Sequence, residues 1–322
     1  MISIQRGMQQ EDPMQDSSDA TTRIDRLRML QAEGGLKGQQ NALPTIGVAF
    51  GGGGARGLAH IHVIEVLDEL GLKPVAISGA SIGAIMGAGM ASGMTGRDIR
   101  AFALSAIGNP ADAWGRLWKS RRPLVKPSFG EGGFRLGQFN IERILNAFLP
   151  EAIPQHFEDL VIPLKVVVTD YYDQTERVCA SGDLRNALAA SAAIPAIFRP
   201  VRRSGRVMVD GGIINPVPFD HLRDQADIII GIDVVGSPAG DPKRLPSTVD
   251  SMFGATQLMM QSIIRLQLKV SPPDILIKPD VGQFRVLEFF KAEKILKATE
   301  GIRDELKRSL DTLIEEKLSN RV

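Results

Sequence analysis

Ser81 lies in the pentapeptide GASIG at residues 79–83, which has the G-x-S-x-G spacing of a nucleophilic serine. The pentapeptide follows a strand-like run, PVAIS at 74–78, and precedes small residues typical of a helix. A nucleophile on a sharp strand-to-helix turn adopts a strained backbone, so the positions two before and two after it must be small. The context predicts Ser81 as a nucleophile between Gly79 and Gly83, although a tight loop with an idle serine remains the plainer alternative.

A second motif, GGGGARG at residues 51–57, lies between a strand-like run at 45–50 and a helical pattern at 58–70. Consecutive glycines at this point leave several backbone N–H groups free to converge on an anion. Acyl transfer needs such donors for the oxyanion of its tetrahedral intermediate, and the loss of one donor costs about 3 kcal/mol. Arg56 adds a positive charge nearby.

The same loop also has the dinucleotide-binding spacing G-x-G-x-x-G, formed by Gly52, Gly54 and Gly57. A dinucleotide site expects an acidic residue about 20 positions later, at the end of the second strand. Here the second strand runs into the serine turn, and Asp68 and Glu69 lie inside the intervening helix. The sequence therefore favours an oxyanion site over a nucleotide site, and no cofactor is expected.

An acidic residue follows in Val209-Asp210-Gly211-Gly212, 129 residues after the serine. An aspartate at a strand end before two glycines can approach another loop closely. A lone Asp-Gly pair is usually a turn, so Asp210 gains its weight from the other two motifs.

The four histidines allow a second arrangement. A Ser…Asp…His order needs a histidine after the acid, and only His221, at the expected start of a helix, follows Asp210. His60 and His62 lie in the helical pattern and are expected to be structural. No H-E-x-x-H or Cys/His cluster exists, so no metal site is expected. The single cysteine, Cys179, lies in a strand-like run and is expected to be buried filler.

Strands must position these motifs. Apolar runs predict further strands at residues 164–169, 177–180, 207–209, 227–234 and 274–277. Strands that alternate with helices, several of them apolar on both faces, predict an α/β fold with three layers and a largely parallel central sheet. Residues 96–163 interrupt the alternation and are expected to cover one end of the sheet.

Two polar or helical segments flank this core. Residues 1–43 are expected to be a mobile extension, and residues 44–322 one hydrolase domain with its motif-bearing core at about 46–235. Residues 284–318 are expected to be helical. Their apolar stripe consists of Ile302, Leu306, Leu310, Leu313 and Leu318.

The composition excludes several protein classes. The chain has 322 residues, 43% of them hydrophobic and 23% charged, as in ordinary globular proteins. The formal net charge is +1, from 38 basic and 37 acidic residues, which gives no reason to expect a nucleic-acid partner. No signal peptide or membrane-spanning run is evident, so we expect a cytoplasmic protein, in which any contact with lipid is peripheral, at the surface of a membrane.

One segment could make such a contact. Trp114 and Trp118, the only tryptophans, are spaced four residues apart, and a helix would place them on one face. Four basic residues follow them: Lys119, Arg121, Arg122 and Lys126. The segment predicts peripheral contact with anionic lipid, with packing of both tryptophans in the core as the alternative.

The three motifs together, GGGGARG, then GASIG, then DGG, resemble those of patatin-like phospholipases. Two further stretches, ASAAIPAIFRPV at 190–201 and DILIKPDVGQFRVLEFFK at 274–291, are similar to the bacterial branch. The resemblance covers the chain from about residue 45 to the C-terminal helix, and it implies a Ser–Asp dyad without histidine. On this resemblance Ser81 is the nucleophile and Asp210 the base.

The resemblance also assigns the glycines and a reaction. It places Gly52, Gly53, Gly54 and Arg56 at the oxyanion hole. The remaining motif glycines are Gly57, Gly79, Gly83, Gly211 and Gly212. The implied activity is hydrolysis of ester-linked acyl chains from lipids through an acyl-serine intermediate. A small-ester hydrolase that uses His221 in a triad and a non-catalytic binding protein of the same fold are the alternatives.

Overall fold

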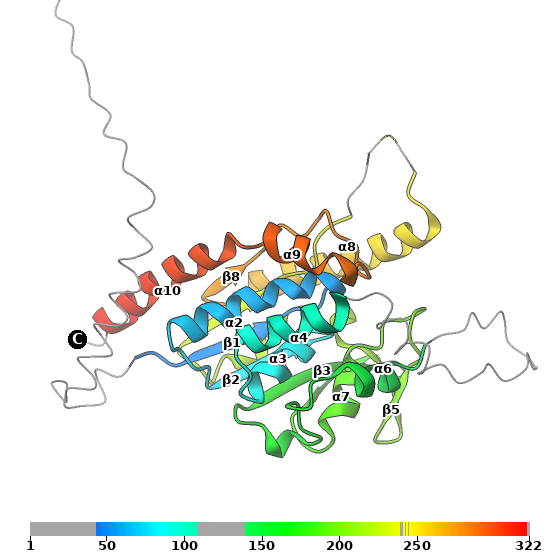
Figure 1. The fold of residues 1–322 in the computed structure, drawn as a ribbon, viewed down its shortest axis with the longest axis horizontal. Coiled ribbons are helices and arrows are strands. Elements are labelled where there is room, and N and C mark those ends of the chain that lie inside the picture. Colours follow the sequence, from blue (N-terminus) through cyan, green and yellow to red (C-terminus); the bar gives the residue numbers. More distant parts are fainter. Residues whose placement is uncertain (1–42, 109–138, 239–240, 242, 244, 321–322) are drawn as a thin grey trace, which may run out of the picture.

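The computed structural model describes residues 43–108, 139–238, 241, 243 and 245–320 (Figure 1). Its strands are β1 (Ile46–Phe50), β2 (Ala76–Ala80), β3 (Leu164–Asp170), β4 (Thr175–Cys179), β5 (Val201–Arg203), β6 (Arg206–Asp210), β7 (Ile228–Ile232) and β8 (Ile275–Ile277). They form one sheet in the order β5-β6-β3-β2-β1-β7-β8, and β4 also pairs with β3. The central sheet flanked by helices confirms the predicted α/β class.

Helices cover both faces of the sheet. The α-helices are α2 (His60–Glu69), α3 (Ile82–Ala91), α4 (Gly96–Gly108), α6 (Ile141–Phe148), α7 (Leu184–Ser191), α8 (Thr248–Val270), α9 (Ala292–Ala298) and α10 (Ile302–Ser319). The short 3-10 helices are η2 (Gly54–Ala59), η3 (Phe157–Asp159), η4 (Gly211–Ile213), η5 (Phe219–Leu222) and η6 (Phe289–Lys291). In Figure 1, α2 and α4 lie in front of the sheet, and α8 runs behind it.

The alternation of side chains along the strands explains the three layers. In β1, Ile46, Val48 and Phe50 belong to the main core under the helices α2 and α3, whereas Ala49 joins a second cluster on the opposite face. Phe219 of η5 belongs to this second cluster. Central strands that are buried on both faces read as continuous apolar runs, because each face of the sheet needs its own apolar side chains.

The sheet is only partly parallel. The pairs β1–β2, β1–β7, β2–β3 and β7–β8 are parallel, whereas β3–β4, β3–β6 and β5–β6 are antiparallel. The antiparallel part was not predicted. Two of its three pairs follow from short connections: β3 and β4 are separated by residues 171–174, and β5 and β6 by residues 204–205. A parallel crossover needs a dozen or more residues, so connections this short can only make hairpins.

The helical segments outside the motifs are arranged as follows. Residues 284–318 contain the helices η6, α9 and α10, with α9 ending at Ala298 and α10 beginning at Ile302. On α10, Ile314 is buried, whereas Leu313 and Leu318 are only partly buried. Within residues 96–163, α4 packs on α2 and α9, and α6 packs on α7, so the described part of this segment thickens the helical layers.

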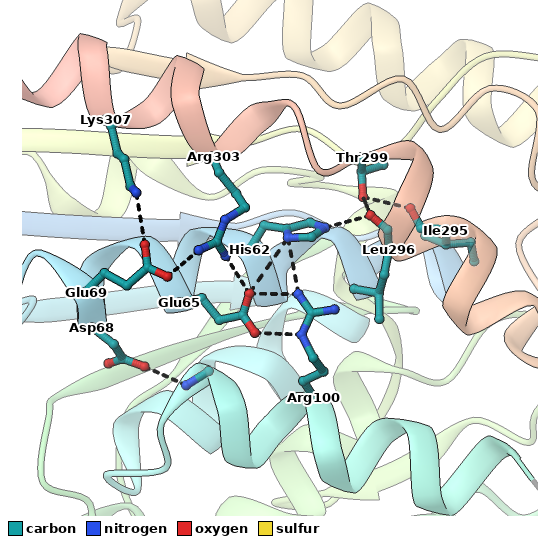
Figure 2. Close-up of polar contacts among 11 residues, drawn as sticks. His62, Glu65, Asp68, Glu69, Arg100, Ile295, Leu296, Thr299, Arg303 and Lys307 are labelled. Carbon is teal, nitrogen blue, oxygen red and sulfur yellow. Dashed lines mark hydrogen bonds and ion pairs between the residues drawn. The ribbon is translucent and has the colours of Figure 1, made fainter. Parts of the chain in front are cut away.

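Charged side chains join the C-terminal helices to the motif-bearing core (Figure 2). Glu65 of α2 accepts hydrogen bonds from Arg100 of α4 at 2.6 Å and 2.7 Å, and from Arg303 of α10 at 2.6 Å. One turn along α2, Glu69 binds Arg303 and also Lys307, the latter at 3.0 Å. These contacts tie α2, α4 and α10 into one layer, so the C-terminal helices are part of the same folded unit as the motifs.

Among the residues that the structure describes, no helix is both long and apolar enough to cross a membrane.

Candidate active site

The site is assembled where two strands meet along one edge of β3. Residues 166–170 of β3 pair with β4, which occupies the other edge. On the opposite edge of β3, β2 pairs with β3 as far as Ala80, which lies opposite Val167. The antiparallel β6 approaches from the opposite direction and ends with Asp210 opposite Val168. Ser81 and Asp210 therefore meet at adjacent positions of β3, although 129 residues separate them in the chain.

Ser81 occupies a strained turn between β2 and α3. Its φ is 54° and its ψ is −127°, in a region that residues with a side chain rarely adopt. The turn requires glycine at position 83, because a Cβ there would lie 2.1 Å from the Phe50 carbonyl oxygen. Three other motif glycines also leave too little room for a Cβ: Gly57 against Ile82 at 2.4 Å, Gly79 against Ala84 at 2.7 Å, and Gly211 against the Val167 carbonyl at 2.0 Å.

The Ser81 hydroxyl contacts Asp210 directly. Its Oγ donates a hydrogen bond of 2.6 Å to Asp210 Oδ2, and Asp210 Oδ1 accepts one of 2.8 Å from the Gly212 N–H. Both side chains are buried. Burial raises the pKa of Asp210 from 3.8 to about 6, while the bonds from Ser81 and Gly212 act in the opposite direction. A carboxylate with this pKa is ionised at neutral pH and can accept the serine proton.

The glycine loop follows β1, whose neighbour β2 leads to Ser81, so parallel pairing places the loop beside the serine. Gly52 lies against Ser81, because a Cβ on Gly52 would be 3.2 Å from Ser81 Cβ. However, the Gly52 N–H donates to the Pro216 carbonyl at 2.9 Å and is not free for an oxyanion. Among the described residues, the N–H groups of Gly53 and Gly54 have no hydrogen-bond acceptor.

Arg56 supports this loop from beneath. Arg56 is 1% exposed, and its Nε donates to the Gly53 carbonyl oxygen at 3.1 Å. Because the peptide is planar and trans, the Gly54 N–H must point away from that carbonyl and from Arg56. Burial lowers the pKa of Arg56 to about 10, and Asp233 opposes the shift, so the side chain stays cationic at neutral pH.

Two further buried residues hold the site, and the motifs gave no sign of them. Ser191 at the end of α7 accepts the Ser81 N–H at 2.8 Å and donates to the Val167 carbonyl at 2.6 Å. Asn215 anchors the segment after the aspartate, since its amide donates to Glu176 at 3.0 Å and to Asp220 at 2.9 Å. Ser191 falls in the stretch 190–201 that resembles the bacterial branch, and this resemblance was the one sign in the sequence that Ser191 could belong to the site.

His221 is not placed to act with Ser81 and Asp210. It lies in the short 3-10 helix η5, and its Nε2 donates to Glu176 Oε1 at 2.7 Å. Asp210 already uses one oxygen for Ser81 and the other for Gly212, so no triad is formed in this structure. The bond to Glu176 raises the pKa of His221, which makes it a pairing group for that carboxylate.

The remaining titratable residues of the sequence analysis lie in structural positions. His60 bonds to the Gly51 carbonyl oxygen at 2.8 Å, and burial lowers its pKa to about 4. His62 bonds to the Leu296 carbonyl oxygen at 2.8 Å (Figure 2). Cys179 is half-buried in β4, and burial raises the pKa of its thiol. Asp68 accepts the Gly96 N–H at 2.6 Å, away from the glycine loop.

Among the described residues, Glu176, Asp220 and His221 form a group that could hold a metal ion, since their ligand atoms lie within 4.8 Å of one another. Sequence spacing did not predict this group. Hydrogen bonds already satisfy it, because Asn215 donates to both carboxylates and His221 to one. Residues 1–42 and 109–138, with Trp114 and Trp118, lie outside the described part of the chain.

A family model for patatin-like phospholipases matches residues 48–223, which contain all three motifs and both partners of the Ser–Asp contact. The chain belongs to the patatin-like phospholipase family. The match ends just after η5, so β7, α8, β8 and the C-terminal helices extend the chain beyond the matched residues.

Curated relatives agree with the family. An uncharacterised NTE family protein of Mycobacterium tuberculosis is 33% identical over 66% of this chain and 55% of its own length. Lysophospholipase NTE1 of Cryptococcus neoformans is 30% identical over 68% of this chain and 12% of its own length. Patatin-like phospholipase domain-containing protein 7 of rat is 28% identical over 78% of this chain and 20% of its own. This patatin-like chain thus spans about half of the mycobacterial relative and less of the others.

Solved structures resemble the fold at low identity. VipD from Legionella pneumophila matches 84% of this chain and 67% of its own, with 15% identity and a TM-score of 0.47. Human GIVD cytosolic phospholipase A2 matches 96% of this chain and 65% of its own, with 12% identity and a TM-score of 0.48.

Proposed function

We propose that this chain is a lipid acyl hydrolase that cleaves ester-linked acyl chains through an acyl intermediate on Ser81. The contact of 2.6 Å between Ser81 Oγ and Asp210 Oδ2 carries the proposal. It joins a hydroxyl on a strained turn to a buried carboxylate with a raised pKa, without a histidine between them. The family and the lysophospholipase relative support an acyl ester of a lipid as the substrate.

The proposed reaction needs one proton carrier. Asp210 accepts the Ser81 proton as Oγ attacks the acyl carbonyl carbon, and it then returns this proton to the leaving alcohol oxygen. A water molecule enters, gives a proton to Asp210, and attacks the acyl-serine. The free acid leaves, and the proton returns to Ser81. The Asp210 carboxylate suits both acylation and deacylation, because a group with a pKa of about 6 can accept and release a proton near neutral pH.

We assign oxyanion stabilisation to the N–H groups of Gly53 and Gly54. Both lie in the loop beside Ser81, and neither has an acceptor among the described residues. Gly54 has a φ of 61°, and a Cβ there would lie 2.2 Å from the Val286 carbonyl oxygen. Gly52 serves instead as a spacer under Ser81, and Arg56 holds the Gly53 carbonyl so that the next N–H points outward.

A fluorophosphonate probe tests the nucleophile. We expect the probe to label wild type and not Ser81→Ala, and hydrolysis of a lipid ester to fall by several orders of magnitude in this variant. Ser92→Ala is the matched control. Ser81 precedes the helix α3 and Ser92 follows it, and the Ser92 hydroxyl bonds only to the Ala88 carbonyl among the described residues. Labelling of Ser81→Ala at another serine would contradict the assignment.

His221→Ala distinguishes the dyad from a triad. Since His221 pairs with Glu176, we expect the variant to keep most of its activity. Asp210→Asn should be nearly inactive while it remains folded. Equal loss of activity in His221→Ala and Ser81→Ala would favour the triad and overturn the dyad.

A further inference from the structure

The helix α8 (Thr248–Val270) carries an apolar stripe on its exposed side. Met252, Met259 and Leu266 recur every seven residues, which is two helical turns, so they share one face. Their exposed fractions are 43%, 61% and 62%. Val249 at the first turn and Val270 at the last extend this stripe and are also exposed. The helix rests on the body through other residues, of which Gly254, Gln257 and Ile264 are buried.

The helix α8 also contacts the segment that follows Asp210. Met260, next to the stripe, lies over the residue that binds Asp210, because a Cβ on Gly212 would be 3.0 Å from Met260 Cε. Ile213, the next residue, is a large apolar side chain that reaches solvent. Met260 and Ile213 thus place apolar side chains beside the segment that follows Asp210.

A second exposed apolar group lies next to the glycine loop in the chain segment that contacts it. Leu287 and Phe290 are exposed, and they follow Val286, whose carbonyl accepts the Ala55 N–H of the glycine loop. Arg285 of the same segment pairs with Asp250 in the first turn of α8 at 3.4 Å. Apolar side chains thus border both the glycine loop and the aspartate segment. In Figure 1 the N-terminal half of α8, drawn in yellow, projects beyond the body of the molecule.

Basic side chains lie beside the stripe. Arg265 and Lys269 are exposed on α8, where Arg265 donates to Ser262 Oγ at 3.0 Å and neither side chain forms an ion pair with a carboxylate among the described residues. Lys269 follows Leu266 by three residues and so lies on the same side of the helix. A surface of flexible apolar side chains with unpaired cations beside it complements anionic head groups over acyl chains.

We propose that the α8 stripe, Met252, Met259 and Leu266 with the adjoining Ile213 and Leu287, docks this chain on an anionic lipid surface. The inference rests on the proposed lipid acyl hydrolase function, because it explains how an ester in an aggregate reaches the buried Ser81. The stripe enters the acyl region beside the entrance, and Arg265 and Lys269 bind the head groups. Docking in this orientation lets a lipid pass from the aggregate to the site across an apolar rim.

The test replaces the stripe by polar side chains of similar size. The triple variant Met252→Gln, Met259→Gln and Leu266→Gln keeps good helix formers at exposed positions, so its circular dichroism and melting temperature should match wild type. The control is Val75→Gln with Val161→Gln, two exposed valines that precede β2 and β3 at the opposite end of these strands. Both sets are made with and without Ser81→Ala.

Binding is measured by sedimentation with phosphatidylcholine vesicles that contain phosphatidylglycerol, using the Ser81→Ala chains so that the vesicles stay intact. We expect the triple variant to bind at least tenfold more weakly than the control. With an active Ser81, it should hydrolyse a short soluble ester within about twofold of wild type, and vesicle lipid much more slowly.

The outcomes separate the surface from the chemistry. Weaker vesicle binding with unchanged soluble-ester hydrolysis supports the docking surface. Weaker binding of a chain that hydrolyses neither ester supports the surface and contradicts the proposed function. Unchanged vesicle binding overturns the docking surface, whatever the activity. If light scattering shows that the stripe variant turns a dimer into a monomer while vesicle binding is retained, the stripe is a contact between copies and the proposal fails.

Discussion

Replacement of Asp210 by asparagine should make the folded protein more stable at alkaline pH while it abolishes hydrolysis. The carboxyl is buried, and burial raises its pKa from 3.8 to about 6. The folded chain therefore binds this proton more tightly than the unfolded chain does. The stability of the fold therefore falls as the pH rises from 3.8, the usual pKa, through about 6, the pKa in the folded chain. Above about pH 6 the whole cost of the buried charge remains.

The size of the deficit follows from the two pKa values. At about 1.4 kcal/mol for each tenfold change, the shift corresponds to about 3 kcal/mol at pH 8 and to about half of that at pH 5. Asparagine carries no charge at either pH, and its amide can still pair with Ser81 and Gly212. For a domain of this size, about 3 kcal/mol corresponds to a rise in Tm of roughly 5–10 °C.

The assay is urea unfolding of wild type and Asp210→Asn at pH 5 and pH 8, followed by circular dichroism. Asp224→Asn is the control, since Asp224 is exposed and its replacement removes no buried charge. We expect a larger gain for Asp210→Asn at pH 8 than at pH 5 and little change in the control. A gain that is equal at the two pH values, or a loss at both, would refute the buried charge as the cause.

Three further predictions concern the same site. The kcat/KM for a soluble ester should fall about tenfold per pH unit below about pH 6, because protonated Asp210 cannot accept the serine proton; an inflection near pH 4 would contradict this. Gly83→Ala should abolish probe labelling, because its Cβ would meet the Phe50 carbonyl, whereas Gly301→Ala, with no atom within 4 Å, should label normally. Ser191→Ala leaves the Ser81 N–H without its acceptor, so we expect a loss of about 1–3 kcal/mol in unfolding free energy and a drop in kcat without a comparable change in KM; unchanged stability would exclude this role.

The sequence predicted the parallel centre of the fold well, because strands buried on both faces leave continuous apolar runs. The strand expected at 164–169 is observed as β3 (Leu164–Asp170), and that at 274–277 as β8 (Ile275–Ile277). The sequence analysis did not predict the helix α8, because the apolar residues of this helix do not follow its buried face. Its buried positions include Gly254 and Gln257, while methionine and leucine face solvent, so its apolar pattern does not indicate a core-facing helix.

The candidate site also contains some residues that the sequence predicts and others that it does not. Ser81 and its neighbouring glycines are local features, since one strand, one turn and one helix determine them. Asp210 needed the resemblance to a family, because a lone Asp-Gly is an ordinary turn. The roles of Ser191 and Asn215 depend on side chains that meet over 110 and 39 residues of sequence, respectively, and no local pattern encodes such pairings.

The approach of β2 and β6 along one edge of β3 also determines when chemistry can begin during synthesis. A nascent chain that has emerged only to residue 200 contains the serine turn, the glycine loop and β3, but it has no base. Its Ser81 is then an ordinary alcohol. The missing carboxylate arrives with β6 (Arg206–Asp210), whose pairing to β3 bridges about 40 residues and requires β3 to be in place already. The proposed hydrolysis therefore requires β6 to be paired with β3, and we expect a chain that ends at residue 200 to be inactive.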